Sequence, residues 1–408
     1  MIWLIIFTLL CLQAAATHAA ELTRGARAEF THAGKGHEVE LSGTAVAAGR
    51  DGDVFMAWAR HDDHTNNLYV TRFTKDGKGT EVVRVNPDGM AVDSLHQSPD
   101  IALGTNGEIY VSWSSAKAKP EGTLFASDVR LSRSLDGGQR FDSHLRINED
   151  RPISHSFEDL AVTVDGTVVV SWIDTREGWD KAGTYLARVG QQGSQLEKVV
   201  TLGGNTCVCC RSHVTTGPNN TVAVLWRTVF PTDIRDMTVR LSSDGGLSFS
   251  PTTRVHKDRW QLNACPHRGG TVGIDAQGRV YTTWYTEGAK QQPAILFATS
   301  KDGKRFSSPL RLDTSRGSVP DHVRMATDPA GRTVVVWEDS TAVHRRVLMR
   351  YTTDGGRTFS AVQSLSPALK AYAPDLTVSP SGVFVIAWHE EQFPLTKTII
   401  QTIQLPDR

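Results

Sequence analysis

The residues of this chain that are best suited to chemistry lie in two short stretches, which hold four of its five cysteines. The first stretch is Asn205-Thr-Cys-Val-Cys-Cys-Arg-Ser-His213 and the second is Cys265-Pro-His-Arg268. Thiolates and imidazoles are the preferred ligands of tetrahedral Zn²⁺ and of thiophilic copper ions. If the fold brings the two stretches together, we expect a Zn or Cu site there. The candidate ligands are Cys207, Cys209, Cys210, Cys265, His267, His155 and His96.

The same four cysteines have a second interpretation, in which they form two disulfides. Cys207 and Cys210 have the C-x-x-C spacing of a redox-type ring, and Cys265 is available to bridge to one of the other three. A c-type haem is excluded, because Arg211 stands where the attachment motif requires a histidine. The sequence leaves the metal site and the disulfides as open alternatives.

The elements that position these residues follow from an internal repeat, in which a β-branched strand ends in tryptophan. The successive spacings between these tryptophans are 55, 59, 54, 58, 53 and 51 residues. The seven tryptophans are Trp58, Trp113, Trp172, Trp226, Trp284, Trp337 and Trp388. Each unit has four short strands of alternating pattern, which is typical of one blade of an all-β propeller. We predict seven blades, and six if one end copy is an irregular cap.

The last unit contains only three strands of its own. The segment from Ala26 to Thr31 has strand character and would supply the fourth from the N-terminus. Closure by both chain ends would remove an open sheet edge. We interpret the repeated tryptophans as a packing position between blades.

Four candidate ligands occupy the same point of successive units. His96, His155, Cys209 and His267 each stand seventeen residues before the tryptophan of their unit. In a propeller, the loop that leads into each innermost strand lies beside the central axis at one face. We call these the leading loops, and we expect them to gather the candidate ligands at the mouth of a central channel.

Three arginines also fall in or near successive leading loops. Arg211, Arg268 and Arg324 are separated by 57 and 56 residues. Guanidinium groups that converge on a channel suit a small anionic ligand such as a carboxylate, phosphate or sulfate. The alternative is that they pair with carboxylates of the channel wall, namely Asp321, Asp159 or Glu158.

The turns between third and fourth strands carry a recognisable signature. Ser134–Phe141 and Ser242–Phe249 match the Asp-box S-x-D-x-G-x-x-[F/W], and Thr352–Phe359 matches with threonine in place of serine. The chain therefore resembles the sialidase-like Asp-box (BNR-repeat) propellers over nearly its full mature length. This resemblance implies a sialidase-like glycoside hydrolase acting on an anionic sugar. Arg211, Arg268 and Arg324 would then bind the substrate carboxylate, and Tyr372 would be the nucleophile. The Arg-Ile-Pro tripeptide of true sialidases is absent.

Composition and the N-terminus restrict the setting. Lys+Arg and Asp+Glu are both 44, and this balance disfavours nucleic acid or an anionic membrane as the main partner. Residues 1–20 form an apolar run followed by small residues, which is typical of a secretory signal peptide rather than a membrane span. We therefore predict a secreted or periplasmic protein in which residues 21–408 form one propeller domain.

These observations favour an exported binding or redox-accessory propeller with a Cys/His metal site at the channel mouth. The first alternative is the sialidase-like hydrolase that the Asp-box resemblance implies. The second is a non-catalytic propeller that has two disulfides and binds a protein partner through its loop face.

Overall fold

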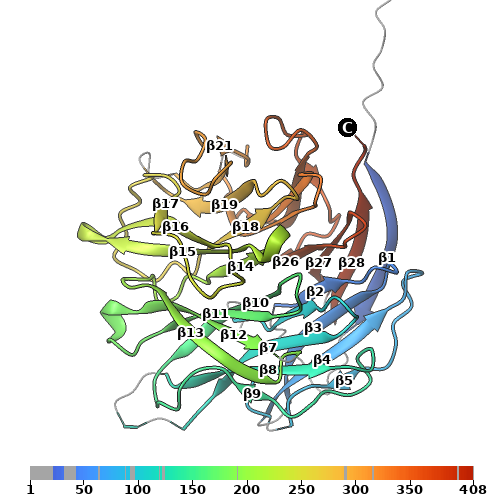
Figure 1. Cartoon of the computed structure of the whole chain (residues 1–408). Helices are drawn as coiled ribbons and strands as arrows, with labels where there is room; N and C mark the ends of the chain where they lie inside the picture. The colour runs from blue at the N-terminus through green and yellow to red at the C-terminus, as the bar shows by residue number, and fades with distance from the viewer. Residues whose placement is uncertain are drawn as a thin grey trace, which may run out of the picture.

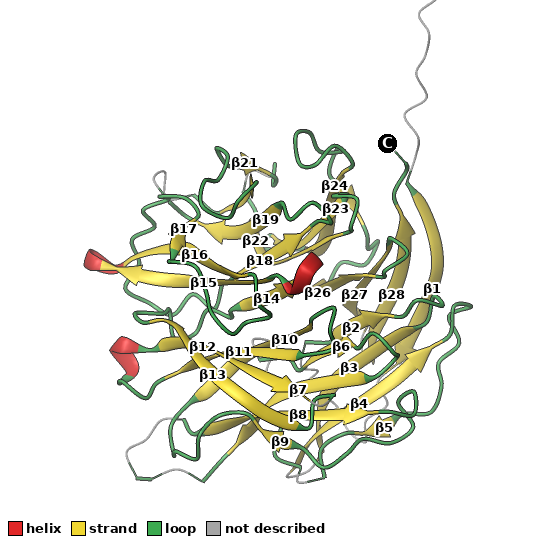
Figure 2. Ribbon diagram, in the orientation of Figure 1, coloured by secondary structure: helices red, strands yellow, loops and turns green. Residues whose placement is uncertain are grey.

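Seven sheets of four antiparallel strands form a ring in the computed structural model of the chain, and the described residues contain almost no helix (Figures 1 and 2). The structure describes residues 22–31, 43–62, 65–87, 89–91, 97–118, 120–121, 125–190, 192–288, 292–314, 317–392 and 395–407. The prediction of seven blades is confirmed, and the six-bladed alternative is wrong. The predicted signal peptide and His96 lie outside the described residues. No described helix is long and apolar enough to cross a membrane.

The blades follow one another along the chain. The first blade contains β2 (Ala45–Ala48), β3 (Val54–Asp62), β4 (Thr65–Phe73) and β5 (Val83–Arg84). The second contains β6 (Asp100–Leu103), β7 (Ile109–Ala116), β8 (Ser127–Ser134) and β9 (Leu145–Arg146). The third contains β10 (His155–Val162), β11 (Val168–Asp174), β12 (Gly183–Gly190) and β13 (Gln195–Gly203). The fourth contains β14 (His213–Thr216), β15 (Val222–Phe230), β16 (Ile234–Ser242) and β17 (Thr253–Arg254). The fifth contains β18 (Gly270–Ile274), β19 (Val280–Thr286), β20 (Ala294–Ser300) and β21 (Leu310–Arg311). The sixth contains β22 (Val319–Thr327), β23 (Thr333–Ser340), β24 (Arg345–Thr352) and β25 (Gln363–Ser364). Three one-turn helices complete the described elements: η1 (Trp179–Lys181), η2 (Pro218–Asn220) and η3 (Pro231–Asp233).

The seventh blade closes the ring with strands from both ends of the chain. It consists of β26 (Ala371–Val378), β27 (Val383–Gln392), β28 (Leu395–Gln404) and β1 (Thr23–Thr31). β1 pairs antiparallel with β28, as Figure 1 shows for the blue and red strands. The predicted N-terminal closure is therefore confirmed, and the observed strand begins three residues before the predicted segment.

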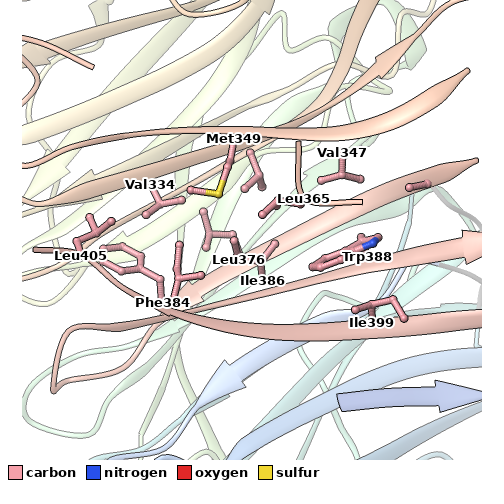
Figure 3. Packing of buried hydrophobic residues seen from close by; sticks show 13 residues of the cluster. Val334, Val347, Met349, Leu365, Leu376, Phe384, Ile386, Trp388, Ile399 and Leu405 are labelled. Atoms are coloured by element: carbon pink, nitrogen blue, oxygen red, sulfur yellow. The ribbon is translucent and has the colours of Figure 1, made fainter. Parts of the chain in front are cut away.

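The core lies between neighbouring blades. Trp388 of β27 is fully buried, and it belongs to an apolar cluster that also contains Ile386 of its own strand and Val347 and Leu365 of the preceding blade (Figure 3). The other six repeated tryptophans are also at most 3% exposed. An aromatic side chain of this size makes a large contribution to core stability when it is buried. The tryptophan repeat is thus the packing position that the spacing predicted.

Three of the inner strands share a bulge at the same point. Phe157, His322 and Ala373 have positive φ angles of 57°, 45° and 48°, and each stands fifteen residues before the tryptophan of its blade. The pairing register of the inner strand shifts at each of these positions. A bulge bends its strand and changes the direction of nearby side chains. Here the bulges change the orientation of residues at the start of the inner strands.

Candidate functional site

A cavity of about 780 Å³ lies among the inner strands of the ring. All seven inner strands line it, from Ala45 in the first blade to Asp375 in the last. At the end formed by the leading loops, its wall carries charged and aromatic groups. These groups are Asp100, Asp159, Arg211, His213, His267, Arg268, Tyr285, Asp321, His322, Arg324 and Asp375. We call this end the cavity mouth.

Each of the three predicted arginines lies at the mouth and faces a carboxylate of another blade. Arg268 Nη2 lies 2.9 Å from Asp321 Oδ2. Arg324 Nε lies 3.2 Å from Asp375 Oδ1. Arg211 Nη2 lies 3.9 Å from an Asp159 oxygen, and its Nη1 donates to Ser98 Oγ at 2.7 Å. The predicted alternative, in which wall carboxylates pair with the arginines, is confirmed for Asp159 and Asp321.

The arginine pairs leave some donors unused. The Nε atoms of Arg211 and Arg268 are buried and have no acceptor among the described residues. A buried N–H without a partner costs free energy, and a ligand oxygen can satisfy it. Tyr285 lies under the Arg268 guanidinium, whose carbon is 4.4 Å from the ring centroid, so this arginine is held in place from two sides.

Two neighbouring carboxyl groups, Asp100 and Asp159, form the acidic part of the mouth. Asp100 Oδ2 accepts the backbone N–H of Leu160 at 2.9 Å, and Asp159 Oδ2 accepts that of Val214. Burial, together with the negative charge of Asp159, raises the pKa of Asp100 to about 8. Burial also raises the pKa of Asp159 to about 6, although the Arg211 charge opposes the change. The pair therefore retains about one proton at neutral pH.

The formal charges at the mouth nearly cancel. Asp321 and Asp375 offset two arginines, and the Asp100–Asp159 pair, which carries about one negative charge at pH 7, offsets the third. Burial lowers the pKa of His213 to about 4, with a further lowering from Arg324, so this imidazole is neutral at pH 7. The mouth therefore has a small net charge. Its guanidinium groups can donate hydrogen bonds to a ligand, and its carboxyl groups can accept them.

Asp100 and Asp375 were not predicted as site residues, and His213 was named only as the end of the first cysteine-containing stretch. All three stand thirteen residues before the tryptophan of their blade, which is also the position of Asp159 and Arg324. Asp375 Oδ2 accepts the backbone N–H of Val46, in the same way that Asp100 and Asp159 bind the next blade. A comparison of the residues that stand thirteen positions before each repeated tryptophan, in addition to those at seventeen, would have identified them.

Tyr372, the predicted nucleophile, is not among the residues that line the cavity. Its ring lies 5.4 Å from that of His389, and the guanidinium carbon of Arg345 lies 4.6 Å from its centroid. Burial raises the pKa of its hydroxyl. The structure thus places Tyr372 beside these two residues and not with the three arginines.

The four cysteines form two disulfides behind the mouth. Cys207 is bonded to Cys210, and Cys209 is bonded to Cys265 of the next leading loop. Cys207 Sγ and Cys209 Sγ lie 3.9 Å apart, and Arg235 Nη1 lies 3.1 Å from Cys207 Sγ. The sulfurs of Cys207, Cys209 and Cys210 all lie within 4.8 Å of one another, as do the nearest ligand atoms of Cys209, Cys265 and His267. The cysteines do not line the cavity.

The histidines predicted as ligands are divided between two places. His267 lies near Cys209 and Cys265 and lines the cavity. His155 belongs to a different cluster, where its Nε2 lies 3.4 Å from Asp174 Oδ2 and its Nδ1 lies 2.7 Å from the Ser127 carbonyl oxygen. The structure therefore does not group His155 with the cysteines.

Comparison with solved structures gives the class of fold. An ulvan lyase, described as a new polysaccharide lyase family and bound to -[GlcA(1-4)Rha3S]-, superposes with a TM-score of 0.58 at 9% identity, covering 88% of this chain and 93% of that chain. A Penicillium chrysogenum α-L-arabinanase with arabinobiose gives 0.53 at 14% identity, covering 93% and 98%. A Hadza microbial sialidase gives 0.51 at 12% identity, covering 85% and 76%.

The chain thus shares a β-propeller fold with these three solved structures. No protein-family model and no curated protein matches the sequence. At identities of 9 to 14% the likeness concerns the fold, so the function has to be argued from the site itself.

Proposed function

We propose that this protein is a carbohydrate-active enzyme that binds a saccharide at the cavity mouth and cleaves a glycosidic bond there. The observation that carries the proposal is the Asp100–Asp159 carboxyl pair beside Arg211 at an open cavity. A carboxyl group that keeps a proton at neutral pH can donate it to the leaving-group oxygen as the glycosidic C–O bond breaks, while water bonds to the anomeric carbon and releases its own proton to solvent. The solved structures of this fold named above, which act on polysaccharides or glycosides, support the same class of substrate.

The proton donor in this proposal is Asp100. Both aspartates line the cavity and both use Oδ2 to accept a backbone N–H, but Asp100 has the higher pKa, about 8 against about 6, and therefore keeps its proton at neutral pH. The Asp159 charge, held beside Arg211, raises the affinity of Asp100 for its proton. Arg268 and Arg324, each fixed by its aspartate, would orient sugar hydroxyl groups through the remaining guanidinium donors.

The paired arginines bear on the kind of sugar. A sialidase-type site would direct three uncompensated arginines at one substrate carboxylate, but here each guanidinium already faces a carboxylate. The near-neutral mouth favours a neutral polysaccharide over a polyanion. We therefore expect arabinan-type substrates to be cut faster than ulvan, and we expect release of sialic acid from a sialoside to be absent or very weak.

The test is turnover of arabinan, xylan, ulvan and a fluorogenic sialoside by the wild-type protein and by Asp100→Asn. The asparagine keeps an oxygen for the Leu160 amide but cannot supply a proton, so turnover should fall at least a hundredfold. Asp136→Asn, on the opposite face in an Asp-box turn, is the matched control and should keep wild-type turnover. Full activity in Asp100→Asn, or no cleavage of any of these substrates, would contradict the proposal.

A second candidate function, a thiophilic metal site, is favoured by the clustering of the sulfurs. Four cysteines and His267 occupy two adjacent leading loops. Reduction of both disulfides would give a set of thiols suited to one tetrahedral Zn²⁺ or Cu⁺ ion. Reduced protein should then bind about one equivalent of metal, and Cys207→Ser or Cys265→Ser should each weaken binding sharply. His155→Ala should have little effect, because His155 lies in another cluster. Absence of metal binding by the reduced protein would exclude this function.

Two disulfides also suit export to an oxidising compartment, as the apolar N-terminal run predicts. We propose that the mature protein begins after residue 16, 19 or 20. Mass determination of protein recovered from the periplasm or medium tests this. An intact N-terminus on exported protein would contradict it.

A further inference from the structure

Two exposed aromatic rings stack against each other on the loops of the second and third blades. Phe125 lies between β7 and β8, and Trp179 begins η1 between β11 and β12. Their ring centroids are 6.2 Å apart and their planes differ by 25°. Phe125 nevertheless remains 62% exposed and Trp179 44% exposed. The contact therefore leaves a large part of both rings in solvent, which is unusual for local packing alone.

These rings lie on the same face of the ring as the cavity mouth. In an antiparallel blade, the loop after the second strand and the loop before the first strand meet at the same end. Figure 2 shows the short helices that follow β11 and β15 projecting toward the same side. Moreover, the two blades that carry the rings are those that supply Asp100 and Asp159.

A buried polar network fixes the loop that carries Trp179. Asp174 is fully buried, accepts the backbone N–H of Arg176 at 2.7 Å and lies 2.6 Å from its guanidinium. The same guanidinium reaches Glu149 at 2.8 Å and lies 3.9 Å from the Tyr185 ring centroid. The loop is therefore held in one conformation before any ligand arrives.

The backbone before Trp179 is also specialised. Gly178 has a φ of 102°, in the region that favours glycine, and its N–H donates to the Thr175 carbonyl at 2.9 Å. This tight turn presents Trp179 at the first position of η1. A rigid loop that exposes an aromatic ring lowers the entropy cost of binding a flat apolar surface.

We propose that Phe125 and Trp179 form a second saccharide subsite that binds a sugar ring of the same polysaccharide whose cleaved bond lies at the cavity mouth. This inference rests on the proposed function. Pyranose and furanose rings present apolar C–H faces that pack on aromatic rings, while their hydroxyl groups stay in water. The two aromatic rings belong to the blades that carry Asp100 and Asp159. The polysaccharide would therefore extend from the cavity mouth over these two blades. Ligand length, rather than ligand charge, should govern the contribution of this subsite.

The test uses the exposure of Trp179, which is the only tryptophan above 3% exposed among the described residues. Limited oxidation with N-bromosuccinimide should modify Trp179 first, and peptide mass spectrometry identifies the site. Arabinan, xylan or ulvan chains that bind the protein should protect Trp179, whereas a monosaccharide should not. Trp179→Ala should weaken binding of the long chain roughly tenfold, the effect of one lost stacking contact. It should leave cleavage of a short fluorogenic arabinoside unchanged, because such a substrate is too short to reach the second subsite.

Two control variants complete the design. Trp179→Phe should restore most of the affinity, and Leu247→Ala, an exposed apolar residue in an Asp-box turn, should behave as wild type. Equal affinity of wild type and Trp179→Ala for a polysaccharide that is cut would overturn the subsite and leave the cavity function intact. Loss of cleavage in Asp100→Asn with Trp179 still protected would support the subsite as a separate contact. Absence of both protection and cleavage with all three polymers would contradict both proposals.

Discussion

Arg268 and Asp321 join the fifth and sixth blades across the cavity mouth, with Nη2 of the arginine 2.9 Å from Oδ2 of the aspartate. Each side chain is about one-fifth exposed, so the pair is neither a free surface ion pair nor a fully buried one. The guanidinium also rests on Tyr285. Partial burial and a second contact strengthen such a pair relative to a surface pair.

The Arg268–Asp321 pair should therefore show energetic coupling. We predict that Arg268→Ala and Asp321→Ala, combined in a double-mutant cycle, give a coupling free energy of about 1 to 2 kcal/mol. Urea unfolding of the wild type, both single variants and the double variant provides the four free energies. Strictly additive changes would show that the pair contributes no more than two independent side chains.

The two disulfides should differ in their contribution to stability. Cys209–Cys265 closes a loop with a sequence separation of 56, whereas Cys207–Cys210 spans only 3. The chain-entropy estimate gives about 4 kcal/mol for the longer loop and about 2 kcal/mol for the shorter one. Cys209→Ser with Cys265→Ser should thus lower the free energy of unfolding more than Cys207→Ser with Cys210→Ser. The reverse order would mean that the shorter bridge has a role other than restricting the unfolded chain.

The Asp100–Asp159 pair should affect stability in one direction as the pH changes. Its pKa values of about 8 and about 6 lie above those of unfolded aspartate. Between about pH 4 and pH 8 the folded state therefore binds more protons than the unfolded state, and the contribution of the pair to stability falls as the pH rises. Asp100→Asn cannot ionise, so its stability relative to wild type should increase from pH 5 to pH 8. Parallel pH profiles of the two proteins in urea unfolding would rule out this titration.

The aspartates of the Asp-box turns should show the opposite pH dependence, because their contribution to stability is lost as the pH falls. Asp354 accepts hydrogen bonds from the backbone N–H groups of Arg357 and Thr358 at 2.8 and 3.0 Å. Bonds to the ionised form, mainly from Thr358 and Thr352, hold its pKa at about 2 despite partial burial. Asp354→Ala should lower the free energy of unfolding by about 1 to 3 kcal/mol at neutral pH. This deficit should shrink as the pH falls from about 4 toward 2, where the wild-type carboxylate becomes protonated.

A substitution of Asp407, whose carboxylate is fully exposed, serves as the control for Asp354. Asp407→Ala should change stability by less than about 0.5 kcal/mol at any of these pH values. Thermal or urea unfolding measures both variants. An equal effect of the two substitutions would show that the box aspartate is not a turn-stabilising residue.

The fold could be predicted from the sequence because one packing position is repeated in every blade. Trp388 and the other six repeated tryptophans each require a buried environment between sheets. Their number therefore gives the number of blades. The closing strand could also be predicted, since the last blade lacked one strand and Ala26–Thr31 had the right alternation.

The site could be predicted only in part, because its contacts join neighbouring blades. Arg211, Arg268 and Arg324 do line one cavity, but Asp375 was not recognised as the partner of Arg324. Glu158, a predicted partner of the arginines, interacts electrostatically with Arg211 but uses Oε2 to accept a hydrogen bond from Ser114 Oγ. A bulge at Phe157 shifts the pairing register just before Glu158, so counting residues does not give the direction of its side chain.

The cysteine pairing could not be derived for a different reason. Four cysteines allow three pairings. Each of the three would place one disulfide within the first loop and one between the two adjacent loops, so the topology does not distinguish them. The observed choice depends on the Cα–Cα distances of 5.4 and 6.0 Å that the folded loops provide. Sequence spacing alone contains neither distance.

The most direct test of a carbohydrate site at the cavity mouth is hydrogen–deuterium exchange of the protein with and without the polysaccharide that it cleaves. If the cavity mouth binds the polysaccharide, the leading-loop segments 205–213, 264–270 and 317–325, which carry Arg211, Arg268 and Arg324, should be protected. The Asp-box turns around Asp136, Asp244 and Asp354, at the opposite face, should exchange at the same rate in both samples. Protection confined to those turns, or no protection anywhere at saturating polysaccharide, would contradict a carbohydrate site at the cavity mouth.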